Sequence, residues 1–161
     1  MNTQFDKQTF ENNFRVTYLI FFALAAGQLL ILVIFLFLIN GVEIPKDNPI
    51  DKIFTFIIPL VGLTSMFASK ILYTQNILKV QQTDTITEKL MKYRSFKIIF
   101  WAILEGAALF SLVAFFLTAN YLYVVVFIFV FGFFLFNRPS KEGFVIDMQI
   151  TGPVKETILR V

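Results

Sequence analysis

The chain has 161 residues, of which 57% are hydrophobic, 16% are charged and 22 are Phe, and its formal net charge is +3. This composition is too apolar for a soluble domain of this length and is typical of membrane proteins. The sequence contains no Cys and no His, which excludes disulfides, a thiol nucleophile, a Cys/His zinc site and a Ser-His-Asp triad. We therefore expect no cofactor, no metal and no nucleic-acid partner.

The first apolar segment follows a short polar start. Phe5, Phe10 and Phe14 stand among polar residues in 1–15. Their spacing predicts a short amphipathic helix in the membrane interface, with a partly ordered polar lead-in as the alternative. Residues 16–39 carry no charge, and about 20 apolar residues cross a bilayer, so this segment predicts the first transmembrane helix.

A loop and a second apolar segment come next. Residues 40–52 contain two prolines, a glycine and mixed charges, which is typical of a surface loop. Residues 53–78 have helical spacing of apolar side chains and predict the second transmembrane helix. Pro59 favours a kink inside this helix, and Lys70 is expected to reach the headgroups.

The third helix is predicted to be unusually long. Thr85 and Glu88 have the spacing of a capping box, which predicts a helix start, and no Pro follows before Thr118. A helix over 86–118 would measure about 50 Å, whereas the hydrocarbon core is only about 30 Å thick. The excess length predicts that the hairpin of the second and third helices projects into the cytosol.

A fourth apolar segment leads to the C-terminal tail. After a turn at 118–120, residues 120–137 predict the fourth transmembrane helix. We thus expect an all-α membrane protein with one transmembrane domain over 1–137. Residues 138–161 form a tail, for which the alternation over 146–150 favours a short strand or another small surface element.

The distribution of basic residues predicts the orientation. Eleven Lys and Arg residues lie in the N-terminal segment, the central charged stretch and the tail, whereas the loop 40–52 has only Lys46 and Lys52. Positively charged loops stay in the cytoplasm. Both termini and the tip of the long hairpin are therefore predicted to be cytoplasmic.

Glu105 is the residue of greatest interest because it is a carboxylate within an apolar run. A charged group at the centre of a transmembrane helix costs roughly 2.5 to 3.5 kcal/mol, which makes Glu105 a candidate functional residue. Counting from Lys97 at 1.5 Å per residue puts Glu105 about 12 Å into the membrane. Gln28, Thr64 and Ser65 fall at similar depth, and we expect Glu105 to meet Gln28 and Thr64 or Ser65 in a buried hydrogen-bonded layer.

Basic residues cluster at the tip of the long hairpin. Lys89, Lys92, Arg94 and Lys97 lie on the predicted third helix just outside the apolar run. A juxtamembrane cluster of this kind binds anionic headgroups at roughly 1 kcal/mol per residue. The cluster predicts contact with headgroups or with a cytosolic partner.

The run Glu105-Gly106-Ala107-Ala108-Leu109-Phe110-Ser111-Leu112-Val113-Ala114 resembles the ion-carrying helix of the proteolipid (c) subunit of rotary ATP synthases. The similarity covers about 56–118, and it implies that Glu105 binds a proton or sodium ion with Ser65 as a polar ligand. The chain departs from that family in its loop, where Thr85-Ile86-Thr87 stands, and in its two flanking helices. The whole chain also resembles small four-helix bacterial inner-membrane proteins.

Two functions remain open from the sequence. The first is a non-enzymatic accessory, assembly or interaction subunit of the bacterial inner membrane, with lipid and a membrane-protein partner or further copies of the chain around it. The second is a proton- or cation-coupled carrier or channel component that uses Glu105. A membrane enzyme is not expected, because the sequence offers no recognisable nucleophile or metal-ligand set.

Overall fold

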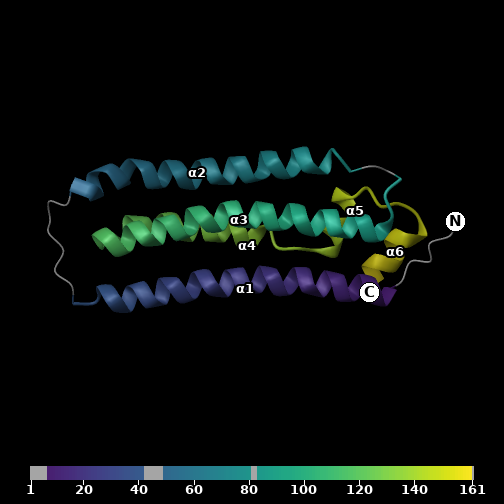
Figure 1. Ribbon diagram of the computed structural model, residues 1–161, viewed down its shortest axis with the longest axis horizontal. Helices are drawn as coiled ribbons and strands as arrows, with labels where there is room; N and C mark the ends of the chain where they lie inside the picture. Colours follow the sequence, from purple (N-terminus) through teal and green to yellow (C-terminus); the bar gives the residue numbers. More distant parts are fainter. Residues whose placement is uncertain (1–6, 42–48, 81–82, 161) are drawn as a thin grey trace.

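The computed structural model describes residues 7–41, 49–80 and 83–160, and within these ranges the chain forms six helices and no strand. The helices are α1 (Lys7–Ile39), α2 (Pro49–Ile77), α3 (Ile86–Thr118), α4 (Leu122–Phe136), α5 (Lys141–Asp147) and α6 (Pro153–Arg160). The three longest helices lie side by side with α3 between α1 and α2, and α4 runs along α3 (Figure 1). The short helices α5 and α6 gather at the end of the bundle where α1 begins (Figure 1).

Three of these helices are long and apolar enough to cross a membrane. They are α1, α2 and α3, and the pair formed by α4 and α5, bent by 76°, counts as a fourth candidate if it is taken as one span. The all-helical fold is therefore confirmed, with three candidate spans, whereas the fourth predicted span over 120–137 stays a prediction because α4 alone is too short to be counted. The first two helices begin earlier than predicted, at Lys7 and Pro49 instead of 16 and 53, and α4 has only 15 residues.

Both ends of α3 are fixed by local hydrogen bonds. The backbone N–H of Thr85 donates to the Glu88 carboxylate at 2.7 Å, and the Glu88 amide donates to the Thr85 hydroxyl at 3.3 Å. At the other end Ala119 adopts a left-handed conformation, and its amide donates to the Phe115 carbonyl at 2.7 Å. The predicted capping box and the predicted bounds of the 33-residue helix are both confirmed.

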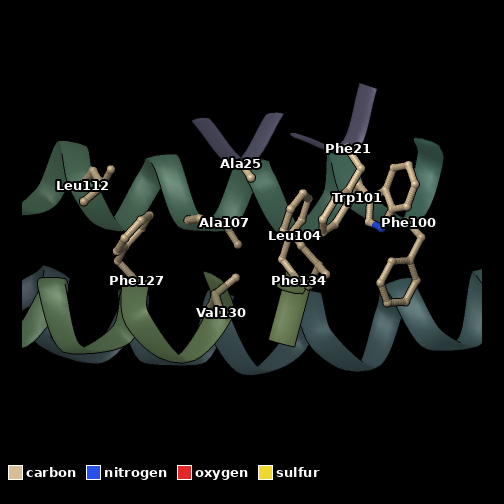
Figure 2. Packing of buried hydrophobic residues seen from close by; sticks show 11 residues of the cluster. Phe21, Ala25, Phe100, Trp101, Leu104, Ala107, Leu112, Phe127, Val130 and Phe134 are labelled. Carbon is tan, nitrogen blue, oxygen red and sulfur yellow. The ribbon is translucent and has the colours of Figure 1, made fainter. Parts of the chain in front are cut away.

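The main hydrophobic core is built on one side of α3. Six of its eleven buried residues come from α3, and the others come from α1 and α4. Figure 2 shows Phe21 of α1 and Phe134 of α4 close to Trp101 of α3, and the rings of Phe21 and Phe134 stack at 4.8 Å. α3 is therefore the helix on which the others pack.

A polar network closes the end of the bundle opposite α5 and α6. The Asp51 carboxylate in the first turn of α2 accepts hydrogen bonds from the Asn120 amide at 3.0 Å and from the Tyr123 hydroxyl at 2.5 Å. Asn120 lies in the turn between α3 and α4. These bonds link the start of α2 to that turn, although the sequence had placed Asp51 in the preceding loop.

The C-terminal tail differs from the prediction. Instead of a short strand, residues 141–147 form α5, and Met148 and Ile150 are buried in a second core with Phe144 and Val145. Of the alternating residues, Met148 and Ile150 are buried but Ile146 is 73% exposed, and the chain turns at 148–149, where Gln149 has a φ of 52°. A lone strand would leave its backbone groups unpaired, whereas two short helices pair them internally.

The N-terminal segment also differs from an interfacial helix. Phe10 and Phe14 are almost fully buried and belong to α1, which continues without a break to Ile39. Their rings lie 5.4 Å and 6.4 Å from the ring of Phe144. The spacing of Phe10 and Phe14 correctly predicted a helix, but their rings contact the tail instead of lipid. Phe5 lies outside the described residues.

Candidate functional site

Glu105 lies on the side of α3 that faces α1. Trp101, Glu105 and Phe116 belong to one stripe of α3, since residues three or four apart share a helix face. Trp101 contacts Phe21 of α1 at 5.1 Å between ring centroids, and Phe116 contacts Phe35 at 4.7 Å. Glu105 is partly buried in this seam between the two helices, with no hydrogen-bond partner among the described residues.

Gln28 belongs to the same seam. It is fully buried, its amide nitrogen donates to the Leu24 carbonyl at 3.4 Å, and its Oε1 has no hydrogen-bond partner. Gln28 follows Phe21 by seven residues and Glu105 follows Trp101 by four, on two helices that run in the same direction (Figure 1). Gln28 and Glu105 are therefore separated along the helix axes by about one helical turn or less.

Thr64 and Ser65 lie on another side of α3. Together with Ala102 and Gly106 they line a groove of about 450 Å³ between α2 and α3. Thr64 donates to the Leu60 carbonyl at 2.8 Å, and Ser65 donates to the Gly62 carbonyl at 2.7 Å. Their hydroxyl protons are thus used within their own helix.

The predicted polar layer is consequently divided between two seams. Thr64 and Ser65 share this groove with Gly106, the residue that follows Glu105 in the sequence. Only Gln28 lies on the α1 side of α3, where Glu105 is found. The predicted hydrogen-bonded layer is therefore not formed in this structure, because Glu105 makes no hydrogen bond to Gln28, Thr64 or Ser65.

The basic cluster is largely occupied by contacts within the chain. Lys89 is buried and donates to the Met148 carbonyl at 3.1 Å, and Lys92 pairs with Asp84 at 2.6 Å. Lys97 is also buried. Among the described residues of this cluster, only Arg94 is partly exposed and makes neither a hydrogen bond nor an ion pair through its side chain. This placement does not favour the prediction of a free basic patch, because burial removes Lys89 and Lys97 from the surface.

Lys97 lies in an aromatic box that sequence reasoning missed. Its ammonium lies 4.5 Å from the ring centroid of Tyr73, 5.5 Å from that of Tyr93 and 5.8 Å from that of Phe100. The Tyr73 hydroxyl donates to the Asp147 carboxylate at 2.5 Å. Aromatic faces attract a cation, and this attraction strengthens when water is excluded.

The aromatic box and Lys89 both hold the end of α5 against α2 and α3. Asp147 is the last residue of α5 and accepts a hydrogen bond from Tyr73. Lys89 donates to the carbonyl of Met148, the residue that follows α5. The spacing of Tyr93, Lys97 and Phe100 by four and three residues was a signal for a cation within an aromatic stripe. Asp147 had no local signal, because it lies 74 residues from Tyr73.

The described residues contain no group of three or more acidic, His or Cys side chains that could hold a metal ion. The candidate site at Glu105 therefore offers one carboxyl group that can take up or release a proton, and the unpartnered amide oxygen of Gln28 lies in the same seam. The site does not contain the nucleophile and base that hydrolytic chemistry requires.

Comparison with known proteins gives no match, since neither a protein-family model, nor a curated protein, nor a solved structure matches the chain. The resemblance of 56–118 to the proteolipid subunit therefore stays a prediction.

Proposed function

We propose that this protein is a non-enzymatic integral membrane protein that works as an accessory, assembly or interaction subunit of a larger membrane complex. The proposal places it in a bacterial inner membrane with both termini in the cytosol. It is supported by the excess of basic residues in the segments assigned to that side, and by the return of the tail to the end of the bundle where α1 begins.

The observation that carries the proposal is the hydrogen bonding of the hydroxyl groups at mid-depth. Thr64, Ser65 and Ser111 each donate to a carbonyl of their own helix. A hydroxyl that bonds to the preceding turn is accommodated in the membrane without any external partner. These groups therefore need neither an ion nor a water path to be satisfied, which favours a packing role over a transport role.

The outer face of α1 is the surface that we assign to the partner. α1 packs on α3 through one stripe, and large apolar residues on its other faces are exposed, with Leu19, Leu30 and Phe37 at 62%, 61% and 76%. A transmembrane helix held on one side leaves most of its circumference for another membrane helix. In the complex, this face would pack against the partner.

Site-specific photo-crosslinking in native membranes tests this assignment. A photoreactive residue at Leu30 should give a discrete protein adduct. Positions of comparable exposure on the other helices, Phe56 at 79% and Phe129 at 71%, serve as matched controls and should give mainly lipid adducts. Protein adducts that are equally abundant at all three positions, or absent at Leu30, would contradict the assignment.

A second function, proton or cation coupling through Glu105, is favoured by one specific observation. The buried Oε1 of Gln28 lacks a donor, and it lies on the same seam as Glu105. In a carrier, protonated Glu105 would donate a hydrogen bond to this oxygen and ionised Glu105 would not, so the bond would form and break as the proton is taken up and released.

Carbodiimide labelling of Glu105 separates the two functions. A carrier needs Glu105 to be reached by protons from water, so the labelling would be fast and pH-dependent and Glu105→Gln would abolish transport. The subunit proposal expects slow labelling, and it expects Glu105→Gln to leave the fold and partner binding intact. Fast, pH-dependent labelling would favour the carrier.

A further inference from the structure

Arg138 lies beside an apolar cleft at the end of α4. The cleft has a volume of about 470 Å³ and is lined by Gly132, Leu135, Phe136 and Arg138. Arg138 follows the last residue of α4 by two positions and is exposed. A guanidinium group therefore sits at the rim of a cleft whose other lining residues are apolar.

The depth of Arg138 follows from the packing of α4 on α3. The indole N–H of Trp101 donates to the Asn137 carbonyl at 3.2 Å, which places the end of α4 level with Trp101. Trp101 lies four residues, or about 6 Å, beyond Lys97, where the third helix is predicted to enter the hydrocarbon. Moreover, the 15 residues of α4 span only about 22 Å of a hydrocarbon core about 30 Å thick. Arg138 is thus held close to the hydrocarbon boundary.

The Arg138 guanidinium has no acidic partner in the described part of the chain. The ion pairs found there join Lys92 to Asp84 and Arg160 to Glu156. A cation near hydrocarbon is stabilised by an anion, and the planar guanidinium matches the oxygens of a phosphate group. The missing counter-charge is therefore expected from outside the protein.

The apolar part of the cleft offers space for a hydrocarbon chain. A Cβ atom added to Gly132 would meet no other atom within 4 Å. Phe136 and Leu135 flank this space and are 91% and 41% exposed. An acyl chain that fills it covers apolar surface at the same time as its headgroup reaches Arg138.

We propose that this cleft binds one anionic glycerophospholipid, with the phosphate on Arg138 and an acyl chain along Gly132 and Phe136. A zwitterionic lipid carries its own ammonium group, which competes with Arg138, so a net negative headgroup is preferred. The proposal requires only that the bundle lies in a membrane. It is independent of the subunit function and of any role of Glu105.

Native mass spectrometry of the full chain in detergent tests this site. With equal amounts of dioleoyl phosphatidylglycerol and dioleoyl phosphatidylcholine, the wild-type chain should retain phosphatidylglycerol in preference. Arg138→Gln should reduce the affinity for phosphatidylglycerol about fivefold, which corresponds to about 1 kcal/mol per basic residue at a membrane surface. Gly132→Leu should reduce the binding of both lipids, because the leucine side chain occupies the cleft.

Lys155→Gln is the matched control because it removes one positive charge from an exposed position on α6. It should leave phosphatidylglycerol binding unchanged. Equal losses in Lys155→Gln and Arg138→Gln would show attraction by the overall charge and overturn the proposal. Unchanged binding in both Arg138→Gln and Gly132→Leu would also overturn it.

Discussion

At the level of single residues, the buried charges of this chain are stabilised in different ways. Lys97 is 8% exposed and lies among three aromatic rings, whereas Lys89 bonds a backbone carbonyl. Glu105 has neither arrangement among the described residues, and the seam in which it lies also holds the unpaired Oε1 of Gln28. The two lysines are thus parts of the packing of the tail, whereas Glu105 makes no such contact.

The hydrogen bond between Tyr73 and Asp147 should hold the tail in place. Tyr73→Phe removes the donor to a carboxylate, and a bond to a charged group contributes about 1.5 to 3 kcal/mol. We expect α5 and α6 to exchange their amide hydrogens about ten to a hundred times faster in this variant, as measured by hydrogen exchange with mass spectrometry.

Tyr121→Phe is the control for this experiment, because Tyr121 is 62% exposed and its ring contacts Phe115 at the other end of the bundle. It makes the same chemical change and should not alter exchange in α5 or α6. If Tyr73→Phe exchanged at the wild-type rate, the bond to Asp147 would not hold the tail.

At the level of helices, α2 approaches α4 closely at Gly62. A Cβ atom added to Gly62 would lie 3.0 Å from Cγ1 of Val126 and 3.3 Å from Cγ2 of Val130. Valine side chains are stiff at their first torsion, so these methyl groups cannot easily move aside. Gly62 therefore permits the approach of α2 to α4.

Replacing Gly62 should weaken the bundle. Gly62→Ala should lower the free energy of unfolding by about 1 to 3 kcal/mol, because it inserts a methyl group into a packed interface. Gly27→Ala is the matched control: a Cβ atom there meets nothing within 4 Å, so stability should stay the same or rise by up to about 1 kcal/mol. Unfolding in a detergent titration measures both values, and equal effects of the two variants would contradict the packing argument.

At the level of the whole molecule, the features predicted from sequence are those that local chemistry determines. The capping box of Thr85 and Glu88 and the bounds of α3 could be predicted because they depend on residues a few positions apart. Depth could be estimated because a helix rises by a constant amount per residue. Thr64 and Ser65 line the same groove as Gly106, which is consistent with this estimate.

The rest of the site could not be predicted because it depends on which helix covers each side of α3. The rise per residue says nothing of direction around the axis, so Thr64 and Ser65 were grouped with Gln28 although they face different seams. Likewise, the hydrogen bond from Tyr73 in the aromatic box to Asp147 could not be predicted, because no local pattern indicates that the tail returns to the bundle.

The orientation of the molecule should follow its basic residues. The chain has no cysteine, so Asn40→Cys and Lys155→Cys each introduce a single thiol at an exposed position. A membrane-impermeant maleimide added to intact cells should label Asn40→Cys only, whereas Lys155→Cys should react only after the membrane is opened. Labelling of Lys155→Cys in intact cells would contradict a cytoplasmic tail.

We propose that this bundle acts by binding a membrane partner and does not need an ionisable group at Glu105. Quantitative co-purification of the wild-type chain and the Glu105→Gln variant in mild detergent tests both parts of this proposal. We expect one membrane protein to be captured in the same amount by both, because glutamine preserves shape and hydrogen bonding while it removes the carboxyl proton. Loss of that protein from the variant, or its absence from both preparations, would overturn the proposal.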